Sequence, residues 1–196
     1  MYCVEHMTAE LRLMAAPRPA YAALARAGHR IGPLASLRRP LVAALILGAS
    51  MTMAATRQAA PAILLSTIAC WGSVIVLQIV IALAVIAGPA RRTVGIPRAL
   101  DLFFASHVPW SLWMLFSVAW APVPGERSLV VVLVAALAPI VLTPRMIAAF
   151  FREVLELDPR RAVLRTGVHQ AITWTAFVLL YGSAIALVPR ILQWIG

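Results

Sequence analysis

The sequence predicts an all-α integral membrane protein with five transmembrane helices, a cytoplasmic N-terminus and a C-terminus outside. Three observations predict this class. Of the 196 residues, 62% are hydrophobic and 12% are charged, and the mean hydropathy is +0.90, values that are typical of membrane proteins. After residue 40, most of the chain consists of long uncharged apolar segments. Arginines separate these segments. The rest of the chain is too short to form a soluble domain that could bury them.

Residues 1–40 form a basic segment that precedes the five-helix transmembrane domain of residues 41–196. Within residues 19–31, apolar residues recur at helical spacing, and Arg26 and Arg30 lie on another face. This pattern predicts a short amphipathic helix that lies in the lipid headgroup layer. A mobile, alanine-rich basic tail is the alternative interpretation.

The first two spans are predicted at residues 41–56 and 62–88. The first has only 16 residues, whereas a bilayer core requires about 20. However, Arg39 and Arg57 can extend from its ends to the interfaces. The second span follows Pro61, since proline is favoured in the first turn of a helix. Its 27 uncharged residues are enough to cross the bilayer with some tilt.

The remaining three spans are predicted at residues 102–121, 129–151 and 168–188. Pro109 lies inside the third span and predicts a kink, where neighbouring groups must satisfy the freed backbone. Asp158 and Pro159 predict the start of the last helix, because aspartate is a good N-cap and proline fits the first helical position. The last helix therefore begins before its span.

The arginines in the connections predict the orientation. All 17 basic residues are arginine, and with five spans 14 of them fall on one side and three on the other. The positive-inside rule assigns the richer side to the cytoplasm. Together with the exclusive use of arginine, this predicts a multi-pass protein of the bacterial cytoplasmic (inner) membrane. Because the arginines lie between apolar segments and not in one patch, we expect no nucleic-acid partner.

His107 is the best candidate for a functional residue within the spans, because ionisable groups in a membrane are costly and usually mark function. Trp110 and Trp113 follow it, and a neutral imidazole in aromatic surroundings can ligate a haem or a chlorophyll-type pigment. The favoured interpretation is a hydrogen bond to a neighbouring helix or to a carbonyl freed by Pro109. No cofactor is therefore predicted. His169, near the cytoplasmic end of the fifth span, is expected to be solvated or interfacial.

Enzyme motifs are missing from the sequence. It contains no HExxH zinc motif, no GxSxG nucleophile elbow, no phosphate-binding glycine loop and no intramembrane aspartate pair. We therefore expect no enzymatic activity. A small-solute transporter is a weaker alternative, because the other four spans are predicted to be apolar at the midplane except for Ser and Thr. The pair Ala44 and Gly48 permits close helix packing, but frequent alanine makes such pairs expected by chance.

Two connections resemble the five-span Yip-type domain family, which is named for eukaryotic members that interact with Rab GTPases. They read GIPRALDLFFASHVPW before the third span and FFREVLELDPRRAVLRTGVHQAI before the fifth. Phe103, Pro109, Arg161 and Ala162 stand at positions that match the pattern of bacterial relatives. The resemblance covers roughly residues 17–190 and lies in spacing and character. It implies an integral membrane scaffold or adaptor without a known reaction.

The expected function is therefore that of a scaffold, an adaptor or an accessory subunit of a larger membrane complex. A haem- or chlorophyll-contacting subunit of a bioenergetic or photosynthetic complex, with His107 as ligand, is the alternative. On the cytoplasmic face we expect contacts with anionic headgroups and with other integral membrane proteins. The residues expected to make these contacts are Arg91, Arg92, Arg98, Phe150, Phe151, Arg160, Arg161 and Arg165.

Overall fold

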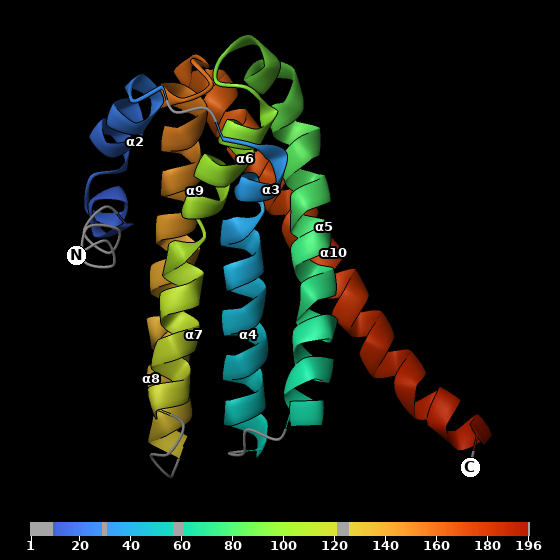
Figure 1. Cartoon of the computed structure of the whole chain (residues 1–196). Coiled ribbons are helices and arrows are strands. Elements are labelled where there is room, and N and C mark those ends of the chain that lie inside the picture. Colours follow the sequence, from blue (N-terminus) through green and yellow to red (C-terminus); the bar gives the residue numbers. More distant parts are fainter. Residues whose placement is uncertain (1–9, 29–30, 57–60, 121–125, 196) are drawn as a thin grey trace.

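The computed structural model describes residues 10–28, 31–56, 61–120 and 126–195, and every regular element in these ranges is an α-helix (Figure 1). Residues 10–15 form a helix before α2. The elements that follow are α2 (Pro17–Arg26), α3 (Pro33–Ser36), α4 (Arg38–Thr56), α5 (Pro61–Arg92), α6 (Ile96–Ala105), α7 (Val108–Trp120), α8 (Glu126–Ala135), α9 (Leu137–Glu153) and α10 (Pro159–Ile195).

Four helical segments within the described residues are long and apolar enough to cross a membrane. They are Pro33–Met53, Pro61–Arg92, Ile96–Trp120 and Val130–Glu153. The all-α class is confirmed for the described residues. The four segments overlap the first four predicted spans. Several helices of this length and composition are typical of a multi-pass membrane protein. α10 covers the predicted fifth span as one continuous helix. Its passage through the membrane stays a prediction, as does the orientation.

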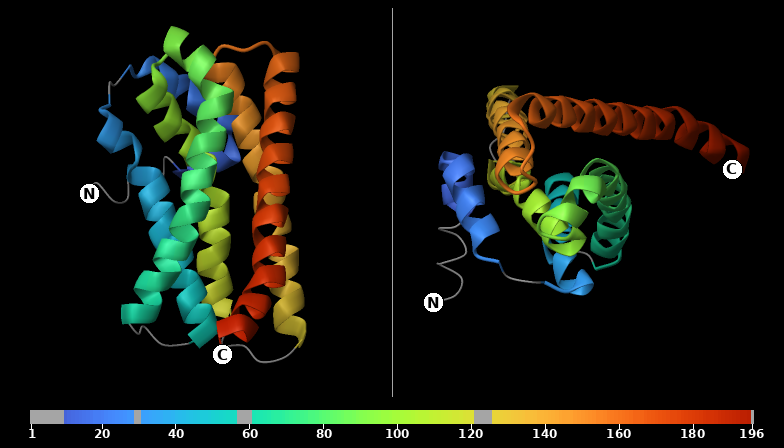
Figure 2. Two further views of the ribbon diagram at one scale, coloured as in Figure 1. Left: turned by 90° about the vertical axis from the view of Figure 1, so that its right-hand side faces the viewer. Right: turned by 90° about the horizontal axis from the view of Figure 1, so that it is seen from above.

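The long helices are arranged as a ring of neighbours. α4 packs against α5 and α7, α7 packs against α9, α9 packs against α10, and α10 returns to α5. The second half of α10 leaves the bundle (Figure 1), and Figure 2 shows it extending sideways when the molecule is viewed from above. The ring is therefore closed only along the first half of α10.

The third span is broken beside Pro109, as the sequence predicts. Ser106 and His107 separate α6 from α7. The hydroxyl of Ser106 donates a hydrogen bond of 2.6 Å to the carbonyl of Phe103, and the N–H of Trp110 donates one of 3.0 Å to the carbonyl of His107. These bonds satisfy the carbonyls of Phe103 and His107 at the break. The break places His107 at the junction of two helices.

One end of the bundle is densely packed, and we call it the packed end. It comprises Leu13, Tyr21, Leu102, Phe103, Phe150, Phe151, Val154 and Leu155, each at most 2% exposed. The hydroxyl of Tyr21 donates a 3.2 Å hydrogen bond to the carbonyl of Leu102, and burial raises the pKa of this hydroxyl. Phe150 contacts Tyr21 edge-on, with ring centroids 5.9 Å apart. Of the helix predicted within residues 19–31, α2 covers the part up to Arg26, and it is docked on the bundle. Arg30 lies outside the described residues, and the place of the helix in the headgroup layer stays a prediction.

The burial of Phe150 and Phe151 corrects a sequence-based expectation. Both side chains were expected to contact a partner, but they are completely buried. The reason is the rotation of α9, whose last turns face α2 and α6. Neither side chain is accessible from outside the bundle.

Charged groups hold α4 and α6 together at the packed end. The guanidinium of Arg39 in α4 pairs with Asp101 in α6, with Nε 3.0 Å from Oδ1, and also with Glu10. Arg98 reaches the other oxygen of Asp101 at 3.6 Å. All four side chains are at most 23% exposed. Partly desolvated pairs of this kind are stronger than pairs in open solvent.

The start of α10 confirms a predicted cap. α10 begins at Pro159, and the backbone N–H groups of Arg160 and Arg161 each donate a 3.1 Å hydrogen bond to Oδ1 of Asp158. Asp158 therefore satisfies two donors that a helix start leaves unpaired.

Gly48 allows α4 and α5 to approach closely. A Cβ atom at this position would lie 2.5 Å from Cγ1 and 2.6 Å from Cα of Ile68. The attribution of the Ala44 and Gly48 pair to chance is therefore wrong. Small residues let two backbones approach where a larger side chain would hold them apart.

Candidate functional site

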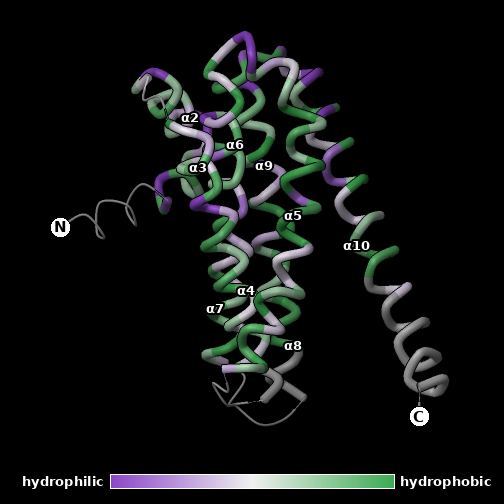
Figure 3. The backbone as a smooth tube through the Cα atoms, turned by 45° about the vertical axis from the view of Figure 1, so that its right-hand side comes forward, coloured by the Kyte–Doolittle hydropathy of each residue, from purple (hydrophilic) through white to green (hydrophobic). Residues whose placement is uncertain are grey.

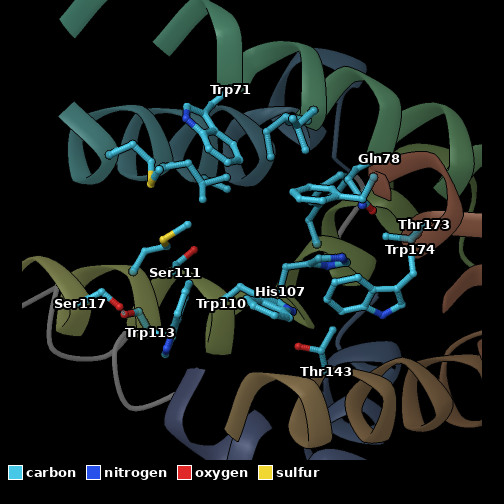
Figure 4. Close-up of a pocket in the computed structure, with 18 of the residues that line it drawn as sticks. Trp71, Gln78, His107, Trp110, Ser111, Trp113, Ser117, Thr143, Thr173 and Trp174 are labelled. Atoms are coloured by element: carbon cyan, nitrogen blue, oxygen red, sulfur yellow. Dashed lines mark hydrogen bonds between the residues drawn. The ribbon is translucent and has the colours of Figure 1, made fainter. Parts of the chain in front are cut away.

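A cavity of about 460 Å³ lies inside the ring of helices, beside the break in the third span (Figure 4). Its lining comes from α4, α5, α6, α7, α8, α9 and α10 and from His107 between α6 and α7. The aromatic members of the lining are Trp71, Phe104, Trp110, Trp113, Trp174 and Phe177. The cavity is thus an internal feature of the apolar bundle.

Polar side chains gather toward one end of this cavity. Figure 4 shows Gln78, His107, Thr143 and Thr173 in one half of the lining, whereas Ser111 and Ser117 lie in the other. The four residues come from α5, from the break before α7, from α9 and from α10. His169 of α10 also lines the cavity. We call Gln78, His107, Thr143, His169 and Thr173 the polar cluster.

Four members of the polar cluster carry buried atoms with no hydrogen-bond partner among the described residues. These atoms are Oε1 of Gln78, Oγ1 of Thr143, Oγ1 of Thr173 and both ring nitrogens of His169. Each unsatisfied polar group of this kind costs about 1–3 kcal/mol. A polar group of a bound molecule would remove this cost.

His169 lies beside His107, which corrects the expectation that it is solvated. It is 1% exposed, and its ring centroid lies 6.2 Å from that of His107. α10 begins at Pro159, so residue 169 is ten residues into the helix, or about 15 Å along its axis. This depth places the ring inside the bundle and not at its mouth.

His107 makes a local contact. Its Nδ1 lies 3.2 Å from the hydroxyl oxygen of Ser106, the preceding residue. The ring also packs against Phe104, with centroids 5.4 Å apart. The predicted hydrogen bond to another helix stays a prediction, and the position of His107 in the lining is what the structure adds.

The two histidines do not fit a macrocycle between them. A haem or chlorophyll-type ring bound by both would lie across the line that joins the two imidazoles. Phe103 packs against both of them, with its ring centroid 5.4 Å from His107 and 5.0 Å from His169. Phe103 therefore stands against a ring held by both histidines. Ligation of a pigment by His107 alone stays a prediction.

The predicted arginines lie around the packed end, where Figure 3 shows hydrophilic residues concentrated near the end of α5 and the start of α10. Arg91, Arg92, Arg160 and Arg161 are exposed. Arg98 is largely buried and donates to the carbonyl of Leu24 at 3.3 Å. Arg165 is half-buried and donates to the carbonyl of Val85. The first four are therefore the ones available to headgroups.

Sequence reasoning misses most of the polar cluster. Gln78 places a carboxamide inside the uncharged second span, and this polar residue was a usable signal. The expectation that the second span is apolar at the midplane except for Ser and Thr is therefore wrong. Thr143 and Thr173 give no comparable signal, because a threonine can bond within its own helix. Of the polar cluster, only His107 was identified from the sequence.

Comparison of the chain with family models, with curated proteins and with solved structures finds no match. The resemblance to the Yip-type family stays a prediction, and the functional argument depends on the cavity.

Proposed function

We propose that this chain is a membrane protein that binds a small lipophilic molecule inside its helical bundle. The observation that carries the proposal is the cavity of about 460 Å³ whose lining holds buried polar atoms without partners among the described residues. Small-molecule sites have volumes of about 300–1,000 Å³ and combine apolar walls with a few convergent polar groups. This cavity has both properties.

The location of the cavity limits what it can receive. It lies between helices that are apolar enough to cross a membrane, and its walls carry six aromatic rings. The break beside Pro109 is consistent with a membrane location of the cavity, because irregular backbone within a membrane is tolerated where it lines a cavity. The walls of the site therefore match a molecule that dissolves in the bilayer.

A fluorescence titration tests the proposal. Four of the six tryptophans line the cavity, and 2-bromonaphthalene quenches tryptophan fluorescence on contact through its heavy atom. Saturable quenching of the detergent-solubilised chain is expected. Ser111→Phe should abolish the saturable part, because Ser111 lines the cavity. Leu112→Phe is the matched control, because Leu112 is 45% exposed and lies on another face of the same helix.

Equal, non-saturating quenching in all three proteins would mean simple partition into the micelle and would contradict the proposal. If Ser111→Phe does not fold, Ala43→Phe fills the same cavity from α4. Circular dichroism and gel filtration identify the folded variants before the titration.

The scaffold or accessory-subunit function expected from the sequence is a second proposal. The course of α10 favours it, because its second half leaves the bundle (Figures 1 and 2) and carries exposed apolar side chains such as Leu179 and Leu180. With Cys3 and Cys70 first replaced by Ser, a photo-crosslinker attached at Leu179→Cys in α10 should capture such a partner in native membranes. The same label at Leu112→Cys in α7 is the control, and both side chains are exposed. Equal labelling at both sites would contradict this second function.

A further inference from the structure

The charge of the lining limits the chemistry of the bound molecule. No Asp, Glu, Lys or Arg occurs among the described residues that line the cavity. A charged ligand would have to leave water without a countercharge, which is very costly in an apolar environment. The cavity is therefore suited to a neutral molecule.

The aromatic walls limit its shape. Trp110 meets Trp113 and Trp174 edge-on, with ring centroids 5.8 and 6.1 Å away. All three rings line the cavity. A ligand that is itself a flat ring makes the largest contact with these aromatic walls, because it can stack on their faces or meet them edge-on.

The polar cluster limits the pattern of the ligand's polar atoms. The hydroxyls of Thr143 and Thr173 can donate or accept, and a neutral imidazole such as that of His169 has one donor and one acceptor nitrogen. The free oxygen of Gln78 can only accept. These groups reach the cavity from three helices. They can therefore bind a ring oxygen either as a carbonyl, which accepts, or as a hydroxyl, which donates.

We propose that the cavity binds a lipid-soluble quinone or its reduced quinol, with a ring oxygen at the polar cluster. This inference rests on the proposed function and adds the class of ligand. The neutral, flat ring packs among Trp110, Trp113 and Trp174. A ring carbonyl accepts from Thr143, Thr173 or His169, and the hydroxyl of the quinol donates to Oε1 of Gln78. The apolar substituents occupy the rest of the cavity and the adjoining bilayer.

A matched pair of ligands tests the inference. Duroquinone and durene share a ring with four methyl groups, and only duroquinone has oxygens. Full substitution also protects duroquinone from addition of thiols such as the exposed Cys70. Equilibrium dialysis of the full-length chain, with equal detergent on both sides, measures the binding of each. We expect duroquinone to bind about tenfold more tightly than durene, as two neutral hydrogen bonds would give.

A matched pair of variants tests the role of the polar cluster. Thr173 has a buried hydroxyl without a partner among the described residues, whereas Thr175 in the same helix is exposed and does not line the cavity. Thr173→Val should weaken duroquinone binding several-fold and leave durene binding unchanged. Thr175→Val should change neither. Thr143→Val repeats the test from α9 if the α10 variant does not fold.

The outcomes separate this inference from the proposed function. If durene binds as tightly as duroquinone, the cavity binds apolar molecules without recognising oxygen. This result would contradict the inference about quinones and leave the proposed function in place. If the preference for duroquinone survives Thr173→Val, Thr143→Val and His169→Phe, the oxygen is bound outside the polar cluster, and the inference is overturned. If neither ligand binds saturably, the inference and the proposed function fall together.

Discussion

The packed end and the cavity differ although they are built from the same helices. On α9, Phe150 is completely buried among other rings, whereas Thr143, two turns earlier, is buried and its hydroxyl has no partner in the described part of the chain. At the packed end, the hydroxyl of Tyr21 reaches the carbonyl of Leu102 at 3.2 Å. In the cavity, the nitrogens of His169 have no such partner among the described residues.

This difference indicates a division of roles along the bundle. Dense packing lowers the free energy of the folded state, whereas a void lined by unsatisfied polar atoms raises it. A protein can retain such a destabilising region and stay folded if other regions supply enough stability. We therefore expect substitutions at the packed end to affect mainly stability and substitutions in the cavity to affect mainly binding.

The largest expected effect is that of Phe150→Ala. Removing a fully buried ring should lower the free energy of unfolding by about 3–5 kcal/mol. Trp174→Ala in the cavity wall should cost much less, because Trp174 is 45% exposed. Reversible unfolding in mixed micelles of increasing SDS content measures both. Equal losses would remove the distinction between the two regions.

Gly48→Ala is expected to cost about 1–3 kcal/mol, because its methyl group would overlap Ile68 and force α4 and α5 apart. Gly72→Ala is the control on α5, where an added Cβ meets nothing within 4 Å. The same SDS titration measures both variants. A neutral Gly48→Ala would show that α4 and α5 do not depend on this close approach.

Loss of one hydroxyl should have opposite consequences in the two regions. Tyr21→Phe leaves the carbonyl of Leu102 without its donor and should lower the free energy of unfolding by about 1 kcal/mol. Thr143→Val removes a hydroxyl that has no partner within the ranges the structure describes and should leave stability unchanged or raise it by up to about 1 kcal/mol in the absence of ligand. A loss in Thr143→Val as large as in Tyr21→Phe would mean that Thr143 has a structural partner.

The smallest expected effect is on lipid association. Arg160→Gln and Arg161→Gln replace exposed cations near the start of α10, and each should reduce retention of anionic lipid about fivefold. Mass spectrometry of lipids that co-purify with the chain measures this ratio. Binding of 2-bromonaphthalene should not change, because neither residue lines the cavity. A loss of that binding would link the two regions.

The sequence predicts what local signals determine. The hydrophobic runs locate four spans, Pro109 predicts the break in the third, and Asp158 predicts the start of α10. These features depend on residues within a few turns of one another. A bilayer also makes apolar runs easy to recognise, since every backbone polar group must be satisfied inside a helix.

Helix rotation and long-range docking escape the same reasoning. Tyr21 bonds to a carbonyl 81 residues away, and Phe150 is buried because α9 turns that face toward α2 and α6. His169 enters the cavity for a similar reason, since α9 and α5 decide which face of α10 points inward. A uniformly apolar span has a weak amphipathic pattern, so its inward face cannot be identified from spacing alone.

Native mass spectrometry of the chain purified from its own membrane tests the central claim most directly. If the cavity binds a lipophilic molecule, wild type and Leu112→Phe should carry a small non-covalent adduct that Ser111→Phe lacks. Ser111 lines the cavity, whereas Leu112 is 45% exposed and does not line it, so only the first substitution fills the site. The same set of adducts on all three proteins would contradict the account, because the bound molecules would then lie on the outer surface of the bundle.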